Sequence, residues 1–226
     1  MSNKFATASI AALLIGGSLQ AQVGHPPDRS PYRDIRVSHS LILGGGYLRG
    51  SGGKIGAGPS EGPIAGLRYS IHLGGPFEAV IGAAGASLLR PIYSNGIPSD
   101  TVRQEVLVAD AGLGFLLTGR KTWRGLAPYF GATLGAAFGE SVPEDTTGFA
   151  FRRRFQFGPH VGVRWYPSQA LSVRLELRDI LWRLVYPRSF FVNPPNDPLL
   201  DASIDSQREW THNPALTLSI GLRIRS

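Results

Sequence analysis

The sequence predicts an all-β fold: an eight-stranded antiparallel up-and-down transmembrane β-barrel with short periplasmic turns and long external loops. Three observations predict it: eight runs of alternating apolar and polar residues, connections that are alternately short and long, and a composition of 29 glycines and 17 prolines in 226 residues. Charged residues make up 17% of the chain and hydrophobic residues 42%. These proportions disfavour a coiled coil or a helical enzyme core, and they also disfavour a disordered chain.

The chain contains no cysteine, which excludes disulfide bonds, cysteine nucleophiles and thiolate metal sites. Its net charge of +7 suits either nucleic acid or anionic lipid headgroups as a partner. The position of the charges, described below, favours lipid, and we expect no binding to nucleic acid.

Residues 1–21 have the layout of a secretory signal peptide. Lys4 is followed by an apolar stretch, 5–16, and then by small and polar residues up to Ala21, where we expect cleavage. The apolar stretch is too short to span a bilayer as a helix, which needs about 20 residues. We therefore expect an exported protein, with a flexible N-terminal lead over 22–34 and the barrel over 35–226.

The last alternating run, 215–224, is the clearest. Leucine and isoleucine occupy its even positions from Leu216 to Ile224, and Thr217, Ser219, Gly221 and Arg223 occupy the odd ones. A strand with one apolar and one polar face has this period of two. Seven further runs alternate in the same way, and most are about as long as the 9–11 residues that a tilted strand needs to cross a bilayer: 35–48, 63–73, 77–89, 107–117, 126–139, 151–166 and 171–178.

The connections between these runs alternate in length. Short turns are expected at 74–76, 119–125 and 167–169. Long loops are expected at 49–62, 90–102, 140–150 and 181–211. Membrane barrels with short periplasmic turns and long external loops have this arrangement. The 181–211 loop is rich in aromatic residues, which gives it the potential to bind a partner.

Alternation alone does not separate a membrane barrel from a soluble sandwich or lipocalin-like barrel, since all of these alternate. Uncharged apolar faces favour a lipid-facing exterior, because charges and unpaired polar groups are costly in hydrocarbon. Aromatic residues near the strand ends predict interfacial girdles: Tyr47, Trp123, Phe138, Trp165, Tyr166, Trp182 and Tyr186. These features predict localisation to the bacterial outer membrane.

The polar faces carry charges of both signs and many glycines, which predicts a narrow lumen filled by ion pairs. An isolated charge in such an interior costs several kcal/mol, so the charges are expected to pair. The expected network consists of Arg68, Glu78, Asp110, Arg164, Arg174, Glu176, Arg178 and Arg223. Arg36 and Arg154 are also expected to point inward.

Three segments resemble strands of a known protein family. They are Ala-Pro-Tyr-Phe-Gly at 127–131, the run Phe-Gly-Pro-His-Val-Gly-Val-Arg-Trp-Tyr at 157–166, and 171–179. They look like strands of small bacterial outer-membrane barrels, namely OmpA-type transmembrane domains and related outer membrane protein β-barrel domain proteins. The resemblance covers about residues 35–226 and implies an architecture more than an activity.

Candidate enzymatic motifs are weak. Ser38, His39 and Ser40 form the best cluster for a serine hydrolase, but neighbours in a strand point to opposite faces and no carboxylate is close in sequence. The glycines at 44–46 lack the Lys–Ser/Thr ending of a phosphate-binding loop. We therefore predict no catalytic residue, no cofactor and no metal site, although a lipid-modifying enzyme remains a lesser alternative.

The predicted function is that of a non-enzymatic integral outer-membrane barrel with a charge-plugged lumen and a structural or surface-interaction role. The alternative is a narrow pore or small-molecule transport barrel with a bias toward anions, since arginine is in excess. Expected partners are outer-membrane lipid, lipopolysaccharide and the barrel-insertion machinery, and the protein is expected to be monomeric. The arginines at 152–154 suit either a solvated rim or the phosphates of lipopolysaccharide.

Overall fold

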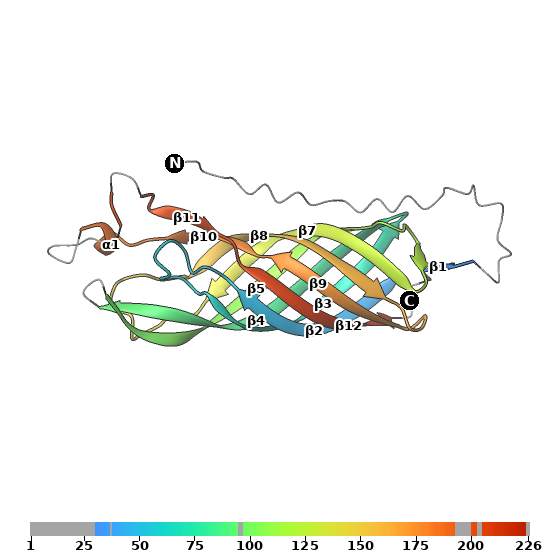
Figure 1. The fold of residues 1–226 in the computed structure, drawn as a ribbon, viewed down its shortest axis with the longest axis horizontal. Coiled ribbons are helices and arrows are strands. Elements are labelled where there is room, and N and C mark those ends of the chain that lie inside the picture. The colour runs from blue at the N-terminus through green and yellow to red at the C-terminus, as the bar shows by residue number, and fades with distance from the viewer. Residues whose placement is uncertain (1–29, 37, 95–96, 193–199, 203–204, 225–226) are drawn as a thin grey trace, which may run out of the picture. The chain divides into compact units, whose positions relative to one another are not determined.

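The computed structural model describes residues 30–36, 38–94, 97–192, 200–202 and 205–224. The expected signal peptide, 1–21, lies outside these residues, as does the lead up to residue 29. Eight strands close into an antiparallel barrel, as predicted (Figure 1). They are β2 (His39–Arg49), β3 (Glu61–Gly74), β4 (Phe77–Ser94), β5 (Ile97–Leu116), β7 (Leu126–Gly139), β8 (Arg153–Trp165), β9 (Leu171–Asp179) and β12 (Pro214–Ile224).

The first and last strands of the ring close the barrel. β12 pairs with β2 over ten residues, from Ala215 opposite Leu48 to Ile224 opposite His39, and on its other edge with β9. Every strand of the ring therefore has two hydrogen-bonded neighbours, and the ring itself has no open edge. The helix α1 (Ser189–Val192) is four residues long. Within the described part of the chain, no helix has the length and apolar character to cross a membrane.

The outer face of the ring is a belt of exposed apolar side chains. On β12 the four residues at even positions from Leu216 to Leu222 are each about half exposed, at 52–58%. The other strands continue this belt with outward-facing residues: Leu43, Leu67, Ile81, Leu107, Leu113, Phe130, Leu134, Phe157, Val161, Leu175 and Leu177. A continuous apolar surface of this kind is stable in contact with lipid and unstable in water.

The short-turn end contains a small extra pair of strands. Glycine at 74 and 75 permits the tight β3–β4 turn, since both residues have positive φ angles. The β5–β7 connection includes β6 (Lys121–Trp123), which pairs with β1 (Tyr32–Asp34). The end of the segment expected to be a flexible lead is therefore a strand, and Ile35 donates a backbone hydrogen bond to Arg120.

At the other end, β4 and β5 continue well beyond the predicted strand ends. Their ladder runs from Phe77 opposite Phe115 to Ser94 opposite Ile97, so the long loop predicted over 90–102 is wrong. The alternation of apolar residues fades in this part because the strands extend past the rim of the barrel. Backbone pairing needs no lipid-facing side chains, and the hairpin therefore continues without them.

The segment predicted as the loop 181–211 contains two strands and the helix α1. β10 (Leu181–Val185) pairs with β8 and with β11 (Arg208–Thr211). Figure 1 shows α1, β10 and β11 at the end of the barrel opposite β1. The long-loop end is therefore a folded structure built on the rim of the barrel.

Candidate functional site in the barrel lumen

The alternating pattern directs one side chain in two from every strand into the lumen. On β9 the inward positions are Ser172, Arg174, Glu176 and Arg178, and all four are buried. The facing strands contribute Glu78 on β4 and Asp110 on β5, which are also buried. Strand parity thus brings residues that are distant in sequence into one interior space.

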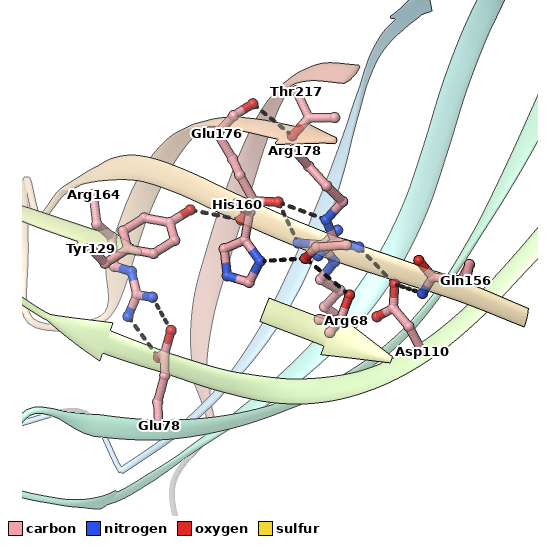
Figure 2. A network of polar contacts seen from close by, with 12 residues as sticks. Arg68, Glu78, Asp110, Tyr129, Gln156, His160, Arg164, Glu176, Arg178 and Thr217 are labelled. Carbon is pink, nitrogen blue, oxygen red and sulfur yellow. Dashed lines mark hydrogen bonds and ion pairs between the residues drawn. The ribbon is translucent and has the colours of Figure 1, made fainter. Parts of the chain in front are cut away.

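One ion pair lies toward the short-turn end of the lumen (Figure 2). Arg164 on β8 donates to both carboxylate oxygens of Glu78, with a distance of 3.0 Å from Nη1 to Oε2. The Arg164 guanidinium also lies 4.8 Å from the centre of the Tyr129 ring. Two hydrogen bonds to one carboxylate fix both side chains, a geometry that favours arginine over lysine.

A second cluster of charges lies around Glu176 (Figure 2). This carboxylate accepts a hydrogen bond from Arg68 at 2.7 Å and one from the Tyr129 hydroxyl at 2.9 Å. Arg178 donates to Asp110 at 2.6 Å, and its Nε lies 3.4 Å from Glu176. The two carboxylates and two arginines therefore form one connected network that crosses the lumen.

Two arginines of the predicted network stand apart from it. Arg174 is buried, but no carboxylate among the described residues lies within ion-pair distance of it. Arg223 is exposed, and its place in the network is a wrong prediction. The alternation of β12 predicts that Arg223 faces inward. It is the second-last residue of the strand, however, and lies at the short-turn mouth of the lumen. Arg36 is likewise exposed, and Arg154 is half-buried and donates to the Ala150 carbonyl oxygen at 2.9 Å.

The long-loop half of the lumen is apolar, which the sequence analysis did not predict. Inward residues of the barrel strands meet buried side chains of the long connections in one cluster, which we call the cap. The strands contribute Leu48, Ile64, Ala86, Leu88, Val106, Val108, Ala137 and Ala215, and the connections contribute Ala57, Phe149, Phe151, Ile180, Trp182, Leu184, Tyr186, Phe190 and Leu200. The signal was present in the sequence, because most inward positions near the long-loop ends of the strands are apolar, with Arg90 and Gln104 as exceptions.

Two members of the predicted aromatic girdles belong to this cap. Trp182 and Tyr186 are 0% and 1% exposed, so their assignment to a girdle is wrong. β10 folds back over the lumen, and the Trp182 ring packs edge-on against Phe151 at 5.1 Å. Arg152 has a positive φ angle, and Phe151 before it is fully buried, whereas Phe155 and Phe157 farther along the strand are exposed.

Four of the remaining predicted girdle residues lie on the outside at both ends: Tyr47, Trp123, Phe138 and Trp165 are 40–49% exposed. Tyr166 faces the lumen instead, where its hydroxyl accepts a hydrogen bond from Arg164 at 3.3 Å, so its assignment to a girdle is wrong. Trp210, which was not assigned to a girdle, lies on the outer face and packs edge-on against Phe155 at 6.4 Å. Amphipathic rings at these positions suit the two membrane–water interfaces.

Polar contacts fix the cap to the loops. Arg90, 1% exposed, pairs with Asp145, donates to the Ala57 carbonyl oxygen at 3.0 Å and lies 4.5 Å from the centre of the Phe149 ring. The Tyr186 hydroxyl donates to Glu209 at 2.6 Å. Burial and this hydrogen bond raise the pKa of Tyr186 above its ordinary value. The cap is therefore held by charge and hydrogen bonding as well as by apolar packing.

The histidines lie in separate environments. His39 is 2.8 Å from the Tyr69 hydroxyl, His160 is 3.3 Å from the Gly158 carbonyl oxygen, and His212 is 2.6 Å from Asp179. None of these three contacts involves a serine, so none reproduces the serine–histidine–carboxylate arrangement of a hydrolase. Across the described ranges, no group of three or more histidine and acidic residues could hold a metal ion.

Comparisons with known proteins identify the fold. No protein-family model matches the chain, and no curated protein matches it. The chain is similar to the crystal structure of Neisserial surface protein A (NspA), with a TM-score of 0.53 and 10% sequence identity over 86% of this chain and 98% of that one. It is also similar to the outer membrane protein OprG from Pseudomonas aeruginosa, with a TM-score of 0.50 and 9% identity over 84% and 98%.

A likeness at this level of sequence identity shows the fold alone. The environment of the barrel is inferred from the surface of the molecule. An apolar belt around a closed ring, with aromatic side chains at both ends, is the surface of a barrel that lies in lipid. The chain has the closed eight-stranded fold of small bacterial outer-membrane β-barrels, and its apolar belt suits contact with membrane lipid.

Proposed function

We propose that this chain is a non-enzymatic outer-membrane barrel with a closed lumen, whose long-loop end serves as a rigid surface for contacts outside the cell. One observation carries the proposal: the lumen is filled in two layers, by ion pairs toward the short turns and by the apolar cap toward the long loops. The two layers are formed by different residues.

The two layers oppose the passage of ions in different ways. In the charged layer, a permeating ion has to displace arginine–carboxylate pairs, and an unpaired buried charge costs several kcal/mol. In the cap, an ion has to lose its hydration shell among leucine, phenylalanine and tryptophan side chains, which offer no ligands. Both costs support a barrel that conducts little.

The non-enzymatic part of the proposal rests on the environments of the polar groups. The buried carboxylates Glu78 and Glu176 each bind a guanidinium, which leaves them poor general bases. His39, His160 and His212 bind a tyrosine hydroxyl, a carbonyl oxygen and an aspartate respectively. These are the contacts of structural residues.

We further propose lipid as the main partner of the outer surface. The belt suits acyl chains, and exposed arginines on the long-loop side suit lipopolysaccharide phosphates: Arg153, Arg183 and Arg208. The closed ring offers no free strand edge to a second copy, which supports a monomer. Barrel-insertion machinery is the expected partner during assembly, and no nucleic-acid partner is proposed.

The alternative function is a narrow pore with a bias toward anions. It is favoured by the composition of the charged layer, in which four inward arginines face three carboxylates. These are Arg68, Arg164, Arg174 and Arg178, with Glu78, Asp110 and Glu176. A path lined in this way would pass chloride more readily than potassium.

Ion flux from liposomes tests the proposal against this alternative. The folded protein is reconstituted, and the release of chloride and of potassium is measured against liposomes that contain the same amount of heat-unfolded protein. A closed barrel leaves both rates at the level of the control. Chloride release well above the control, with slower potassium release, would replace the closed barrel with the anion-selective pore.

A further inference from the structure

Among the described residues, one arginine in the short-turn half of the lumen has no carboxylate within ion-pair distance. Glu78 is bound by Arg164, while Glu176 and Asp110 are shared by Arg68 and Arg178. Arg174, which is 6% exposed, has only two long contacts, at 3.4 Å from Nη2 to the hydroxyl oxygens of Ser40 and Ser70. Its Nε has no hydrogen-bond partner. A buried guanidinium in such surroundings is costly, unlike the paired arginines beside it.

The hydroxyls that contact Arg174 line a pocket at the short-turn mouth of the barrel. The pocket is also lined by Ser172, Gly221 and Arg223. Arg174 lies directly behind the pocket, because its Nη2 is 3.4 Å from the hydroxyl oxygens of both Ser40 and Ser70. An anion bound to these hydroxyls therefore lies close to the charge of this guanidinium.

The pocket offers hydrogen-bond donors in addition to charge. The hydroxyls of Ser40 and Ser70 are 2.7 Å apart, so one of their two hydrogens lies between them and the other can be donated to a ligand. The carboxylate of Glu78 also lines the pocket, but both of its oxygens bind Arg164. The other polar groups of the lining include the Arg223 guanidinium, the serine hydroxyls and the His72 imidazole, whose Nε2 has no hydrogen-bond partner among the described residues.

The rim around this mouth is basic as well. The exposed cations of the short-turn segments are Arg33, Arg36, Arg120, Lys121, Arg124 and Arg223, and Asp34 is the exposed carboxylate of the same described segments. An excess of one sign of charge around a cleft raises the local concentration of ions of the opposite sign. The rim therefore favours the approach of anions to the pocket.

We propose that this pocket binds a tetrahedral oxyanion of the phosphate class, held by Arg223 and by the hydroxyls of Ser40 and Ser70, with the charge of Arg174 directly behind these hydroxyls. Phosphate presents several acceptor oxygens, which match the fork of a guanidinium and the hydroxyl donors. The anion supplies the negative charge that the lumen lacks at Arg174. Free phosphate and the phosphate of a phospholipid headgroup share this chemistry and both can approach the short-turn mouth.

Calorimetric titration of the folded full-length protein with inorganic phosphate tests the proposal. The protein is held in micelles of a non-ionic maltoside detergent, which carries no phosphate, and chloride is used to keep the ionic strength constant. The variants are Arg174→Gln and Arg223→Gln, and the control is Arg183→Gln, which removes an exposed arginine at the opposite end. We expect saturable binding in the wild type, with affinity at least about tenfold lower in both variants and unchanged in the control.

A second arm distinguishes the source of the anion. The same four proteins are reconstituted into vesicles of a phosphate-free galactolipid with and without phosphatidylglycerol, and the unfolding midpoint is measured. If the site takes a lipid headgroup, phosphatidylglycerol raises the midpoint of the wild type and of Arg183→Gln more than those of the two variants, whether or not free phosphate binds.

The outcomes decide between a site and an unpaired arginine. Phosphate binding or a phosphatidylglycerol effect that depends on Arg223 supports the proposal even if Arg174→Gln fails to fold, because Arg223 is exposed and its loss leaves the interior intact. Neither effect in the wild type, or effects that are equal in all four proteins, would overturn it.

Discussion

At the scale of single residues, Glu176 is the side chain on which the charged layer depends most. It accepts hydrogen bonds from Arg68 and Tyr129 and lies 3.4 Å from Nε of Arg178. Its removal leaves guanidinium charge in the interior without compensation. Loss of one partner of a buried pair typically costs about 3–5 kcal/mol.

We therefore predict that Glu176→Ala lowers the free energy of unfolding by about 3–5 kcal/mol. The control, Glu144→Ala, removes an exposed carboxylate from the β7–β8 connection and is expected to change it by less than about 0.5 kcal/mol. Urea unfolding in detergent micelles measures both. Equal losses in the two variants would mean that strand β9 does not direct Glu176 into the lumen.

Tyr186 is the residue that makes the stability of the cap depend on pH. Its raised pKa means that the folded state favours the neutral phenol. The contribution of Tyr186 to the free energy of unfolding is therefore complete below the unfolded pKa of about 10, and it is lost as the pH rises through the higher pKa of the folded state. Replacement by phenylalanine removes this ionisation together with the hydrogen bond to Glu209.

We predict that Tyr186→Phe lowers the free energy of unfolding at pH 8 by about 1–3 kcal/mol. This is the usual cost of removing a hydrogen bond to a charged group. The difference is expected to shrink as the pH rises above about 10. Unfolding midpoints of both proteins from pH 8 to pH 12 test this. A difference that stays constant over this range would exclude ionisation of Tyr186 as the cause.

At the scale of elements, β10 and β11 form a two-stranded lid with an inner and an outer face. Trp182 on β10 is fully buried in the cap, whereas Trp210 on β11 is 48% exposed on the outer face. The two tryptophans are close neighbours in the ladder, because Trp182 is paired with Thr211. They therefore form a matched pair for measuring what burial in the cap contributes.

We predict that Trp182→Ala lowers the free energy of unfolding by about 3–5 kcal/mol, as for other large side chains in packed cores. Trp210→Ala is expected to cost about 1 kcal/mol, because its ring is half exposed. Guanidinium unfolding in micelles gives both values. Similar losses for the two variants would show that β10 does not close over the lumen.

The elements differ in how well the sequence predicts them. The eight barrel strands and their facing follow from the alternation in runs such as 215–224 and 171–178, since lipid on one side and a packed lumen on the other impose a period of two. The continuation of β4 and β5 to Ser94 and Ile97 is not predictable in this way. Beyond the lipid, the side chains of these strands no longer have to alternate.

The candidate site was predicted in part for a similar reason. Strand parity places Glu78, Asp110 and Glu176 in the lumen, but it does not tell which arginine each carboxylate binds. Trp182 and Tyr186 were placed on the wrong surface because the pairing of β10 with β8 depends on contacts between distant segments. No local pattern encodes such a contact.

At the scale of the whole molecule, the barrel has polarity both across its wall and along its axis. Across the wall, apolar side chains face outward and charges face inward. Along the axis, the lumen changes from charged at the short turns to apolar beneath the long loops. Because of this change along the axis, disruption of the charged layer is not expected to open the barrel, since the cap still closes the other half.

Single-channel recording in planar lipid bilayers tests the closed lumen most directly. The proteins are the wild type, Glu176→Ala, Trp182→Ala and the double variant, each first shown to be folded by its shifted migration on an unheated detergent gel. We predict no channel events for the wild type or either single variant, since one intact layer suffices, and events with a preference for chloride for the double variant. Steady channel events in the wild type would contradict the closed lumen.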